Sequence, residues 1–521
     1  MDSRRWDRIV PAAALVAILL LLCAGSATAR SAGFASQVRA AERRVAARLA
    51  ATERSTPAGR YAYYTVGNAW KYSNAQGWAG GYASGGLWLM YQVTGNDWWR
   101  RHASSRQAAI GAAPITPQSL NLGALFFPTY VRGFKLTGDP RFKAKALKAA
   151  VAMAARYDPD VGAMRSRPNG DFNVIIDSLM KPQLLWWAAD HGGPASLREI
   201  AYHHAYTTAR DFLRDDGSTY HIVFYDDTTG AVKLKTTSAG YGPESMWARG
   251  QAWGILGFAA AYRETGDAVF LQAARRVTDR YLADLPADMV PCWDFRDPAI
   301  PASPRDSSAA AIAASGMIDL ALAEPDAANG ARYAAAARAT LASLMSRAYA
   351  SHGANPAVLL HGTYSWHGGV TDRGLAYGDA FFLEALMRLR RLAPQGAGLP
   401  VKRARASAGD AAQAIDGLLD TAWTARGTQW LELDLGVARE AGALRIALRH
   451  GAARAARLRV ITSTDRRHWR AGVTTMTSGE TAGYETLGFA PRTARYVRVW
   501  CDGTSVGRGD AIAEAEVYAA P

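Results

Sequence analysis

The sequence predicts a mainly α-helical domain over residues 30–391, followed by an all-β domain over residues 403–521. Two observations carry this prediction: a helical-hairpin pattern that repeats along the first part, and an alternation of apolar and polar residues in the second. A chain of 521 residues is long enough for two or three domains. Its content of 49% hydrophobic and 20% charged residues excludes a wholly disordered or collagen-like chain.

The helical part repeats one motif: an apolar helical stretch, then Thr-Gly followed by Asp or Asn, then a second helical stretch. The clear copies are centred on Gly95, Gly138 and Gly266, and weaker copies lie near Gly192, Asp326 and Pro394. Glycine commonly ends a helix in a left-handed conformation, and Asp or Asn commonly caps the next helix. The motif therefore predicts about six helical hairpins, which fit a closed ring and an open solenoid equally.

Residues 392–402 read LAPQGAGLPVK and are expected to form a linker. Beyond them come four runs of alternating apolar and polar residues. They are WLELDLG from Trp430, ALRIALRH from Ala443, RLRVITSTD from Arg457 and RYVRVW from Arg495. A two-residue period is typical of strands with one buried face, so the second part is expected to be a β-sandwich.

The N-terminus, residues 1–29, is expected to be a signal peptide. Three arginines precede an apolar run over residues 10–22, and Ala-Thr-Ala at 27–29 forms a small-residue cleavage site before Arg30. The alternatives are an uncleaved anchor and a lipoprotein attached at Cys23. The run is short for a membrane span, and the large Leu22 argues against lipidation. The mature chain is thus expected to be secreted, extracellular or periplasmic, with no membrane span.

The net charge of +15 at neutral pH suits an acidic partner such as a uronate-bearing polysaccharide. The arginines are spread along the chain and no nucleic-acid motif is present, so nucleic acid is not an expected partner. Cys292 and Cys501 lie far apart in the sequence, and no disulfide is expected. The 16 tryptophans fit sugar-binding surfaces and a large helical core about equally.

Asp177 stands in the apolar stretch VIIDSLM, where an ionised carboxylate is costly unless it is paired. A carboxyl group in apolar surroundings holds its proton more strongly than one in water, as a general acid requires. The alternative is structural, because Asp177 begins a helical run and could cap it.

The segment MWARGQAWG places Arg249 and Trp253 four residues apart, on one face of a helix. Such an arginine can bind a carboxylate while the indole stacks on a sugar; the alternative is a buried arginine paired with a structural acid. His221, in DGSTYHIVFYDD, can bond a substrate or the neighbouring backbone. Asp306 or Ser307, in RDSSAAA, is expected to cap a helix.

The sequence contains no HExxH, phosphate-binding glycine loop or paired CxxC motif, and its one GxSxG run, residues 503–507, lies in the all-β part and outside the helical domain. Each of these motifs supplies a metal, nucleophile or phosphate site for a particular chemistry. Protease, esterase, kinase and zinc-protein functions are therefore not expected.

Residues 60–395 resemble the unsaturated glucuronyl hydrolases, glycoside hydrolase family 88, because the motifs of that family occur here in the same order. The resemblance rests on several long motifs, among them GWAGGYASGGLWLMYQVTG, LNLGALFFPTYVRGFKLTGD, VIIDSLM, ESMWARGQAWGILGFAAAYRETGD, RDSSAAAIAASG and YGDAFFLEAL. The related unsaturated rhamnogalacturonyl hydrolases match these segments less well.

The resemblance implies a six-hairpin α/α barrel that removes a 4,5-unsaturated uronic acid from oligosaccharides left by polysaccharide lyases. It implies hydration of the vinyl-ether double bond, with Asp177 as the catalytic acid and base and with no metal or organic cofactor. By motif position, the residues implied to line the substrate site are Asn121, His221, Arg249, Trp253, Trp78 and Arg167.

The chain departs from the family pattern at two of these positions. Leu120-Asn121 replaces the usual His-Asp, so a second carboxylate near Asp177 is missing, and Arg167 takes the place of a subsite tryptophan. The alternatives are therefore an unsaturated rhamnogalacturonyl-type hydrolase and a catalytically weakened barrel that binds acidic glycans. Arg167 also suggests the hypothesis of a sulfated or second acidic sugar.

Residues 403–521 resemble a discoidin or coagulation-factor type C domain, through segments such as QWLELDLG, STDRRHW and RYVRVW. This resemblance implies a module that docks on polysaccharide. The sequence matches the calcium loop of this family only in part. The candidate ligands for a structural calcium are backbone carbonyls together with Asp420 and Glu514, and no cofactor is expected. Trp423 and Trp469 are expected in the core rather than on a sugar platform.

Overall fold

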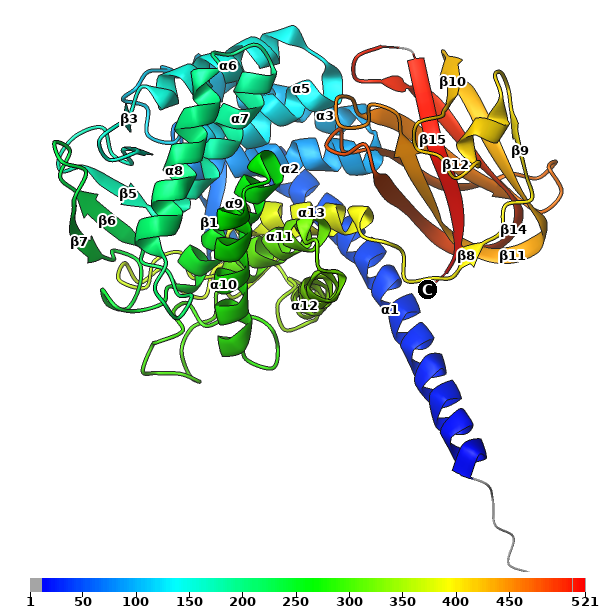
Figure 1. Ribbon diagram of the computed structural model, residues 1–521, viewed down its shortest axis with the longest axis horizontal. Coiled ribbons are helices and arrows are strands. Elements are labelled where there is room, and N and C mark those ends of the chain that lie inside the picture. The colour runs from blue at the N-terminus through cyan, green and yellow to red at the C-terminus, as the bar shows by residue number, and fades with distance from the viewer. Residues whose placement is uncertain (1–11, 508, 521) are drawn as a thin grey trace, which may run out of the picture.

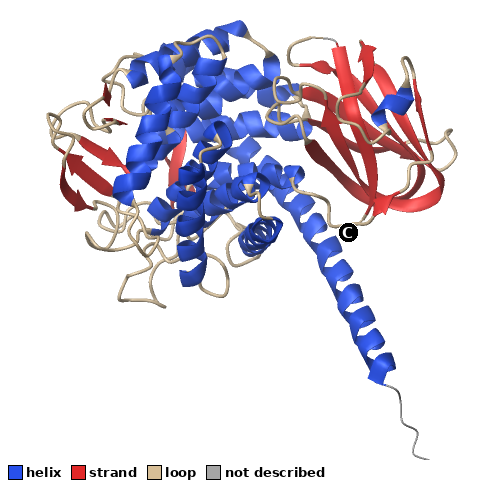
Figure 2. Ribbon diagram, viewed as in Figure 1, coloured by secondary structure: helices blue, strands red, loops and turns tan. Residues whose placement is uncertain are grey.

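A computed structural model describes residues 12–507 and 509–520 (Figure 1). A helical body and a β domain lie side by side, as Figure 2 shows by secondary structure. The last helical turn of the body ends at Arg391 and the first strand of the β domain begins at Gly398. The predicted fold class, mainly α followed by all-β, is confirmed.

In the described chain, the helical body consists of six inner helices or helical runs and six outer helices. The inner ring comprises α2 (Trp78–Thr94), α4–η1–α5 (Leu122–Phe126, Phe127–Val131, Arg132–Thr137), α7 (Pro182–Asp190), α9 (Ala248–Thr265), α11 (Ser307–Ala323) and α13 (Ala376–Arg388), the last followed by η3 (Leu389–Arg391). The outer layer comprises α1 (Ala12–Ser55), α3 (Asp97–Ala112), α6 (Pro140–Ala154), α8 (Ser196–Phe212), α10 (Ala268–Asp284) and α12 (Ala327–Met345).

Burial separates the two layers. Nearly every residue of α2 and of α9 is buried, whereas α3 and α10 bury one face only. A helix that is apolar all round belongs in a core, and an amphipathic helix belongs at a surface. Helix α13 packs against α2, so the ring closes and the body is an α/α barrel rather than an open solenoid.

The repeated sequence motif forms the C-terminal ends of the inner ring. Gly95, Gly138 and Gly266 end α2, α5 and α9 with φ angles of 61°, 69° and 69°. A side chain is strained at such angles, which accounts for glycine at these positions. The residue after each glycine, Asn96, Asp139 or Asp267, accepts a backbone N–H of the next outer helix, and so does Asp326 at the start of α12.

The chain alternates between outer and inner helices, so all the inner helices run in the same direction. Their N-termini therefore lie together, at the end of the barrel opposite the glycine turns. Unpaired N–H groups give helix N-termini a partial positive charge. The segments that lead into the inner helices carry β1 (Tyr61–Val66), β2 (Ala69–Ser73), β3 (Tyr157–Asp158), β4 (Ala163–Met164), β5 (Asn173–Ile175), η2 (Ile176–Met180), β6 (Ile222–Tyr225) and β7 (Val232–Thr236). This end of the barrel therefore favours anions.

Helix α1 runs without a break across the expected cleavage site before Arg30. Its N-terminal part projects from the body in Figure 1. Residues 1–11 of the expected signal peptide lie outside the described residues, and cleavage at Arg30 stays a prediction. Among the residues that the structure describes, no helix has the length and apolar character needed to cross a membrane.

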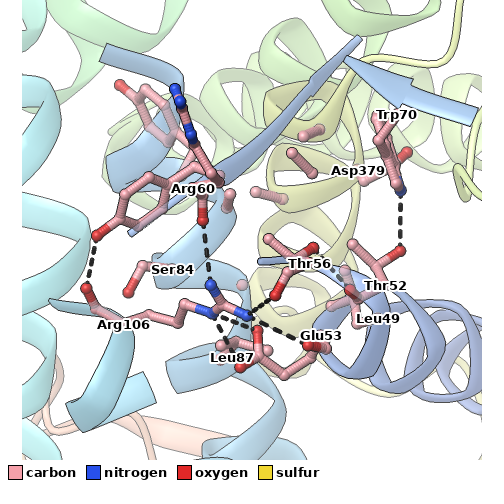
Figure 3. A pocket seen from close by; sticks show the side chains of 17 residues that line it. Leu49, Thr52, Glu53, Thr56, Arg60, Trp70, Ser84, Leu87, Arg106 and Asp379 are labelled. Carbon is pink, nitrogen blue, oxygen red and sulfur yellow. Dashed lines mark hydrogen bonds and ion pairs between the residues drawn. The ribbon is translucent and has the colours of Figure 1, made fainter. Parts of the chain in front are cut away.

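The end of α1 is tied to the barrel by Arg106 of α3, as Figure 3 shows. Its Nε donates to both carboxylate oxygens of Glu53 at 2.9 Å, and its Nη atoms donate to the carbonyls of Thr56 and Pro57 at 2.7 Å. His102 contacts the same carboxylate at 3.0 Å. The side chains of Arg106 and Glu53 are only 12% and 9% exposed, so the ion pair is shielded from water.

The β domain is built on two long antiparallel strands, β11 (Gln429–Leu448) and β14 (Tyr484–Thr504). The strand order is β10-β15-β11-β14-β12-β13, with β8 paired to β15 and β9 to β11. The remaining elements are β8 (Gly398–Leu399), β9 (Arg403–Ala406), η4 (Ala411–Ala414), β10 (Trp423–Arg426), β12 (Ala456–Ser463), β13 (Arg470–Met476) and β15 (Gly509–Ala519). All four alternating runs fall in strands β11, β12 and β14, as predicted.

Two details of this domain differ from the predictions, the structure of the linker and the burial of Trp469. The expected linker contains β8, which extends the sheet by pairing with β15. Trp423 is fully buried in the core, whereas Trp469 is only partly buried. Cys292 is buried in the barrel and Cys501 in the β domain, so the two thiols belong to different domains.

Of the two candidate calcium-binding side chains, Glu514 holds a loop. Glu514 accepts the N–H of Gly417 at 2.6 Å, and Asp416 accepts the N–H of Leu418 at 3.0 Å. Asp420 is exposed. Among residues 12–507 and 509–520, no group of three or more acidic, histidine or cysteine side chains is placed to hold a metal ion.

The β domain packs against the C-terminal end of the inner ring, away from the anion-favouring end. Arg457 donates to the carbonyl of Gly95, and Thr475 donates to the carbonyl of Gln92 at 3.1 Å. Glu480 lies 3.4 Å from the Nζ of Lys135. Burial alone would raise the pKa of Glu480, but Lys135 and the arginines of η3 and α13 hold it well below its usual range.

We expect Arg106→Ala to lower the free energy of unfolding of the barrel by about 3 kcal/mol, because it leaves the shielded carboxylate of Glu53 without its ion-pair partner. Urea unfolding followed by tryptophan fluorescence measures the change. Arg100→Ala is the matched control on the same helix: its pair with Asp97 is exposed, and its loss is expected to cost about 0.5 kcal/mol. Equal losses in the two variants would contradict the assignment.

Candidate active site

A cavity of about 650 Å³ opens at the anion-favouring end of the barrel. Its wall combines the starts of α2 and α4, η2, the loop before β5, strands β6 and β7, and α9. A cavity of this size accommodates a small oligosaccharide. Six of the seven predicted site residues line it: Trp78, Asn121, Arg167, Asp177, His221 and Trp253.

Asp177 and His221 are brought together by strand register. Strands β5 and β6 are antiparallel, with Ile175 opposite Ile222, and the N–H of Ile176 donates to the carbonyl of His221 at 2.9 Å. The next residue, Asp177, therefore lies beside the imidazole: its Oδ2 is 3.7 Å from Nε2 of His221. The two side chains come from separate segments that only the small sheet joins.

The imidazole of His221 has a defined tautomer. The backbone N–H of Ser238 donates to its Nδ1 at 3.2 Å, so Nδ1 is an acceptor and the proton of the neutral ring sits on Nε2, facing Asp177. Burial lowers the pKa of His221, while the charge of Asp177 acts to raise it. The ring thus presents an N–H donor to the cavity.

Asp177 does not cap a helix, which is the structural role that its position also allowed. It lies inside η2, the residue at the start of that turn is Ile175, and no side-chain cap is formed there. Among the described residues its Oδ2 is shielded from water and has no hydrogen-bond partner. A shielded carboxylate oxygen without a partner is costly, and at an active site it marks a group reserved for a ligand.

Two further shielded polar atoms of the cavity wall lack a partner among the described residues: Nε1 of Trp253 and Nζ of Lys181. Aromatic rings form another part of the wall. Trp78 packs on Tyr377 with ring centroids 4.5 Å apart, and Trp253 contacts Phe381 edge-on at 5.3 Å. Indole rings with a free N–H combine an apolar face with a donor, which suits a sugar.

Asn121 is placed by a buried arginine behind it. The guanidinium of Arg156 donates to the carbonyls of Pro117 at 2.6 Å, of Ser119, and of Leu120 at 3.4 Å. Asn121 follows directly and donates from its side-chain amide to the carbonyl of Gln76 at 2.9 Å. Its amide oxygen remains a neutral acceptor at a position where a carboxylate would carry charge.

Arg249 is not brought to the cavity wall. Its guanidinium donates to Asp306 and to the carbonyl of Thr363, both at 2.6 Å, and to the carbonyl of Tyr364 at 2.7 Å. The structure therefore shows a buried arginine paired with a structural acid, the second of the two roles considered for it. Asp306 also caps α11 by accepting the N–H of Ser308, as predicted.

Lys181 is the residue that sequence reasoning missed. It follows η2 directly, four residues after Asp177, and is the one basic residue in the run VIIDSLMKPQLLWW. A single cation inside so apolar a stretch was an available signal, because such a side chain needs a partner. Arg167 behaves differently: it lines the cavity from an exposed loop.

The cavity thus holds a carboxyl group that can exchange a proton, an imidazole N–H beside it, aromatic walls and a cation. Carboxyl chemistry between aromatic walls is characteristic of enzymes that act on sugars, and the fold and site together define a glycoside hydrolase of the α/α-barrel class. Comparisons with known proteins give the particular family. The chain belongs to glycosyl hydrolase family 88, whose sequence profile matches residues 51–381. An F5/8 type C domain profile matches residues 401–515.

This chain covers most of the length of the relatives that it matches. The unsaturated glucuronyl hydrolase of Formosa agariphila is 34% identical over 325 residues, which are 60% of this chain and 80% of that protein. The unsaturated glucuronyl hydrolase of Bacillus sp. strain GL1 is 35% identical, covering 60% and 86%. The unsaturated chondroitin disaccharide hydrolase of Streptococcus pyogenes serotype M1 is 34% identical, covering 60% and 80%.

Solved structures agree with the fold. A heparin-specific unsaturated glucuronyl hydrolase superposes with a TM-score of 0.65 at 29% identity, covering 68% of this chain and 96% of that one. The Bacillus sp. GL1 enzyme superposes with a TM-score of 0.64 at 31% identity, covering 68% and 97%. The barrel accounts for the shared part, and the implied α/α barrel is confirmed.

We expect Asp177→Asn to lower the pKa of His221 further below its usual value, because the substitution removes the negative charge that acts to raise it. The titration of His221 is followed by NMR of protein with isotopically labelled histidine, with the resonances of His468 in the β domain as internal reference. An unchanged or higher pKa of His221 in the variant would show that the two side chains are not coupled.

Proposed function

We propose that this chain is a secreted glycoside hydrolase that removes a 4,5-unsaturated uronic acid from the non-reducing end of lyase-generated oligosaccharides. The observation that carries the proposal is one carboxylate oxygen of Asp177, Oδ2, which lines the cavity wall and has no hydrogen-bond partner among the described residues. Relatives named as unsaturated glucuronyl and unsaturated chondroitin disaccharide hydrolases support it. A solved relative holds an unsaturated, sulfated disaccharide (dGlcA-GalNAc6S), which supports an acidic glycan substrate.

In the proposed reaction, the protonated Asp177 gives its proton to C4 of the double bond. Positive charge develops at C5 and on the ring oxygen, and the carboxylate just formed takes a proton from the water that adds to C5. The resulting C5 hemiketal opens to a ketone and leaves a hemiacetal at C1. That hemiacetal breaks down to an aldehyde and releases the remaining sugar as an alcohol.

The neighbours of Asp177 fit this reaction. The Nε2–H of His221, 3.7 Å from Oδ2, can orient the carboxylate or the incoming water. Trp78 and Trp253 provide apolar faces for the sugar ring. No step needs a metal or an organic cofactor, so none is included in the proposal.

Two other functions remain as alternatives. An unsaturated rhamnogalacturonyl-type hydrolase would use the same cavity on a pectin-derived sugar. A weakened barrel that only binds acidic glycans is favoured by one observation, the neutral Asn121 at the cavity wall in place of a second carboxylate. The names of the relatives include heparin and chondroitin substrates, so the parent polysaccharide is itself an object of the test.

We expect Asp177→Asn to slow the reaction by about 10²–10⁴-fold, because the amide cannot transfer the proton. Loss of the ultraviolet absorbance of the conjugated double bond is followed with unsaturated disaccharides from lyase-digested chondroitin, hyaluronan, heparin and pectin. The responding sugar names the substrate. Asp190→Asn, at the exposed far end of α7, is the matched control and is expected to keep the wild-type rate.

The outcomes separate the alternatives. A response with the pectin-derived disaccharide alone would favour the rhamnogalacturonyl-type function. If no disaccharide loses its absorbance but calorimetry detects binding, the glycan-binding function replaces the proposal, and Asn121→Asp becomes the variant that should restore hydration.

Secretion and polysaccharide docking are part of the proposal. The apolar run and the Ala-Thr-Ala site support an extracellular or periplasmic location, and the F5/8 type C domain supports docking on the polysaccharide. We expect the full-length chain, expressed in a secreting bacterial host, to be recovered outside the cytoplasm with Arg30 as its first residue. N-terminal sequencing measures this, and a chain retained in the cytoplasm with its first 29 residues intact would contradict it.

A further inference from the structure

Lys181 lines the cavity, and its ammonium group has no hydrogen-bond partner among the described residues. It lies at the junction of η2 and α7, and its stem packs against α4: a Cβ added to Gly123 would lie 3.2 Å from its Cα and 3.3 Å from its Cγ. The glycine therefore makes room for the lysine stem. Its Nζ is shielded from water and, among the described residues, donates to no hydrogen-bond partner.

Among the described residues, no neighbouring group neutralises the positive charge of Lys181 through a hydrogen bond. Arg156 repels it and Asp177 attracts it, while His204 behind it is buried. Burial is the main cause that lowers the pKa of Lys181 to about 7, with Arg156 adding to it. Burial and Lys181 lower the pKa of His204 to about 3, so that ring is neutral and offers no negative charge. An isolated ammonium in such surroundings is costly unless an anion reaches it.

The other cations near the cavity are already engaged or differently placed. Arg249 is bound to Asp306 and two carbonyls, and Arg156 is bound to carbonyls of the loop that precedes Asn121. Arg167 lies on an exposed loop at the cavity wall. Among the described residues that line the cavity, Lys181 is thus the shielded cation without a partner.

We propose that Lys181 binds an anionic oxygen of the acidic sugar, the carboxylate or a sulfate ester, and so takes the anion-binding role that Arg249 does not fill in this chain. The inference rests on the proposed function, because it concerns the same cavity. An anionic oxygen supplies the partner that the ammonium lacks, and the bound charge lies beside Asp177, where the reaction takes place.

The test compares substrates that differ in one charge. Wild-type and Lys181→Met enzymes are assayed on the unsaturated chondroitin disaccharide and on its methyl ester, which lacks the carboxylate charge but keeps the double bond. The 6-O-sulfated disaccharide forms a third arm. Lys181→Arg tests rescue by a conserved charge, and Lys148→Met, exposed on α6, is the matched control.

If Lys181 binds the carboxylate, Lys181→Met raises KM for the acid by about ten- to a hundred-fold and leaves KM for the ester and kcat for both nearly unchanged. If it binds the sulfate, the variant loses its preference for the sulfated disaccharide instead. Lys181→Arg should recover part of either effect. An equal loss on acid, ester and sulfated substrates would overturn the proposal and assign Lys181 a structural role.

Binding distinguishes a failure of this inference from a failure of the proposed function. Calorimetric titration of the acid and the ester into Asp177→Asn, with and without Lys181→Met, needs no turnover. A preference for the acid that disappears with Lys181→Met supports the anion site even if the wild-type enzyme shows no hydration. Equal affinities for acid, ester and sulfated disaccharide with Lys181 intact would overturn it even if hydration is observed.

Discussion

The buried ion pair between Arg249 and Asp306 joins three parts of the barrel at the end where the cavity opens. Asp306 caps α11, and Arg249 reaches from α9 to the carbonyls of Thr363 and Tyr364 in the segment that leads to α13. Both side chains are almost completely buried, at 5% and 0% exposure. Loss of either partner would leave an unpaired buried charge, which costs about 3–5 kcal/mol. The relative placement of three inner helices therefore depends on one charge pair.

Because Arg249 is paired with Asp306, it does not supply a positive charge to the cavity wall. The helix N-termini supply a diffuse positive potential, but a directed cation must come from elsewhere, and Lys181 is the shielded candidate in the wall. Asn121 removes a negative charge from the same wall. With a neutral residue at Asn121 and a basic residue at Lys181, the surroundings of Asp177 are more positive than they would be with a second carboxylate at position 121. This charge balance favours acidic sugars as ligands.

The two ends of the barrel differ: one end contacts the β domain and the other forms the cavity. The glycine turns at the C-terminal ends of the inner helices are narrow and rigid, and two of them, at Gly95 and Gly138, meet the β domain directly. Glu480 adds a charged contact in a cluster of basic side chains there. The longer segments at the other end are free to form the small sheet and the cavity. The β domain thus packs against the barrel without covering the cavity.

The sequence by itself determined what depends on local geometry: the glycine turn at Gly95 and its repeats, the cap at Asp306 and the alternating strands, because capping and periodicity act over a few residues. It also singled out Asp177. Only the tertiary structure decided that the ring closes, that Arg249 faces a structural acid, and that the Nζ of Lys181, in the cavity wall, has no hydrogen-bond partner among the described residues. Those outcomes depend on which side chains meet across segments more than fifty residues apart, as Arg249 and Asp306 do at a separation of 57. Local sequence patterns do not predict such long-range contacts, because the packing of the whole closed barrel determines which side chains are buried and which charges pair.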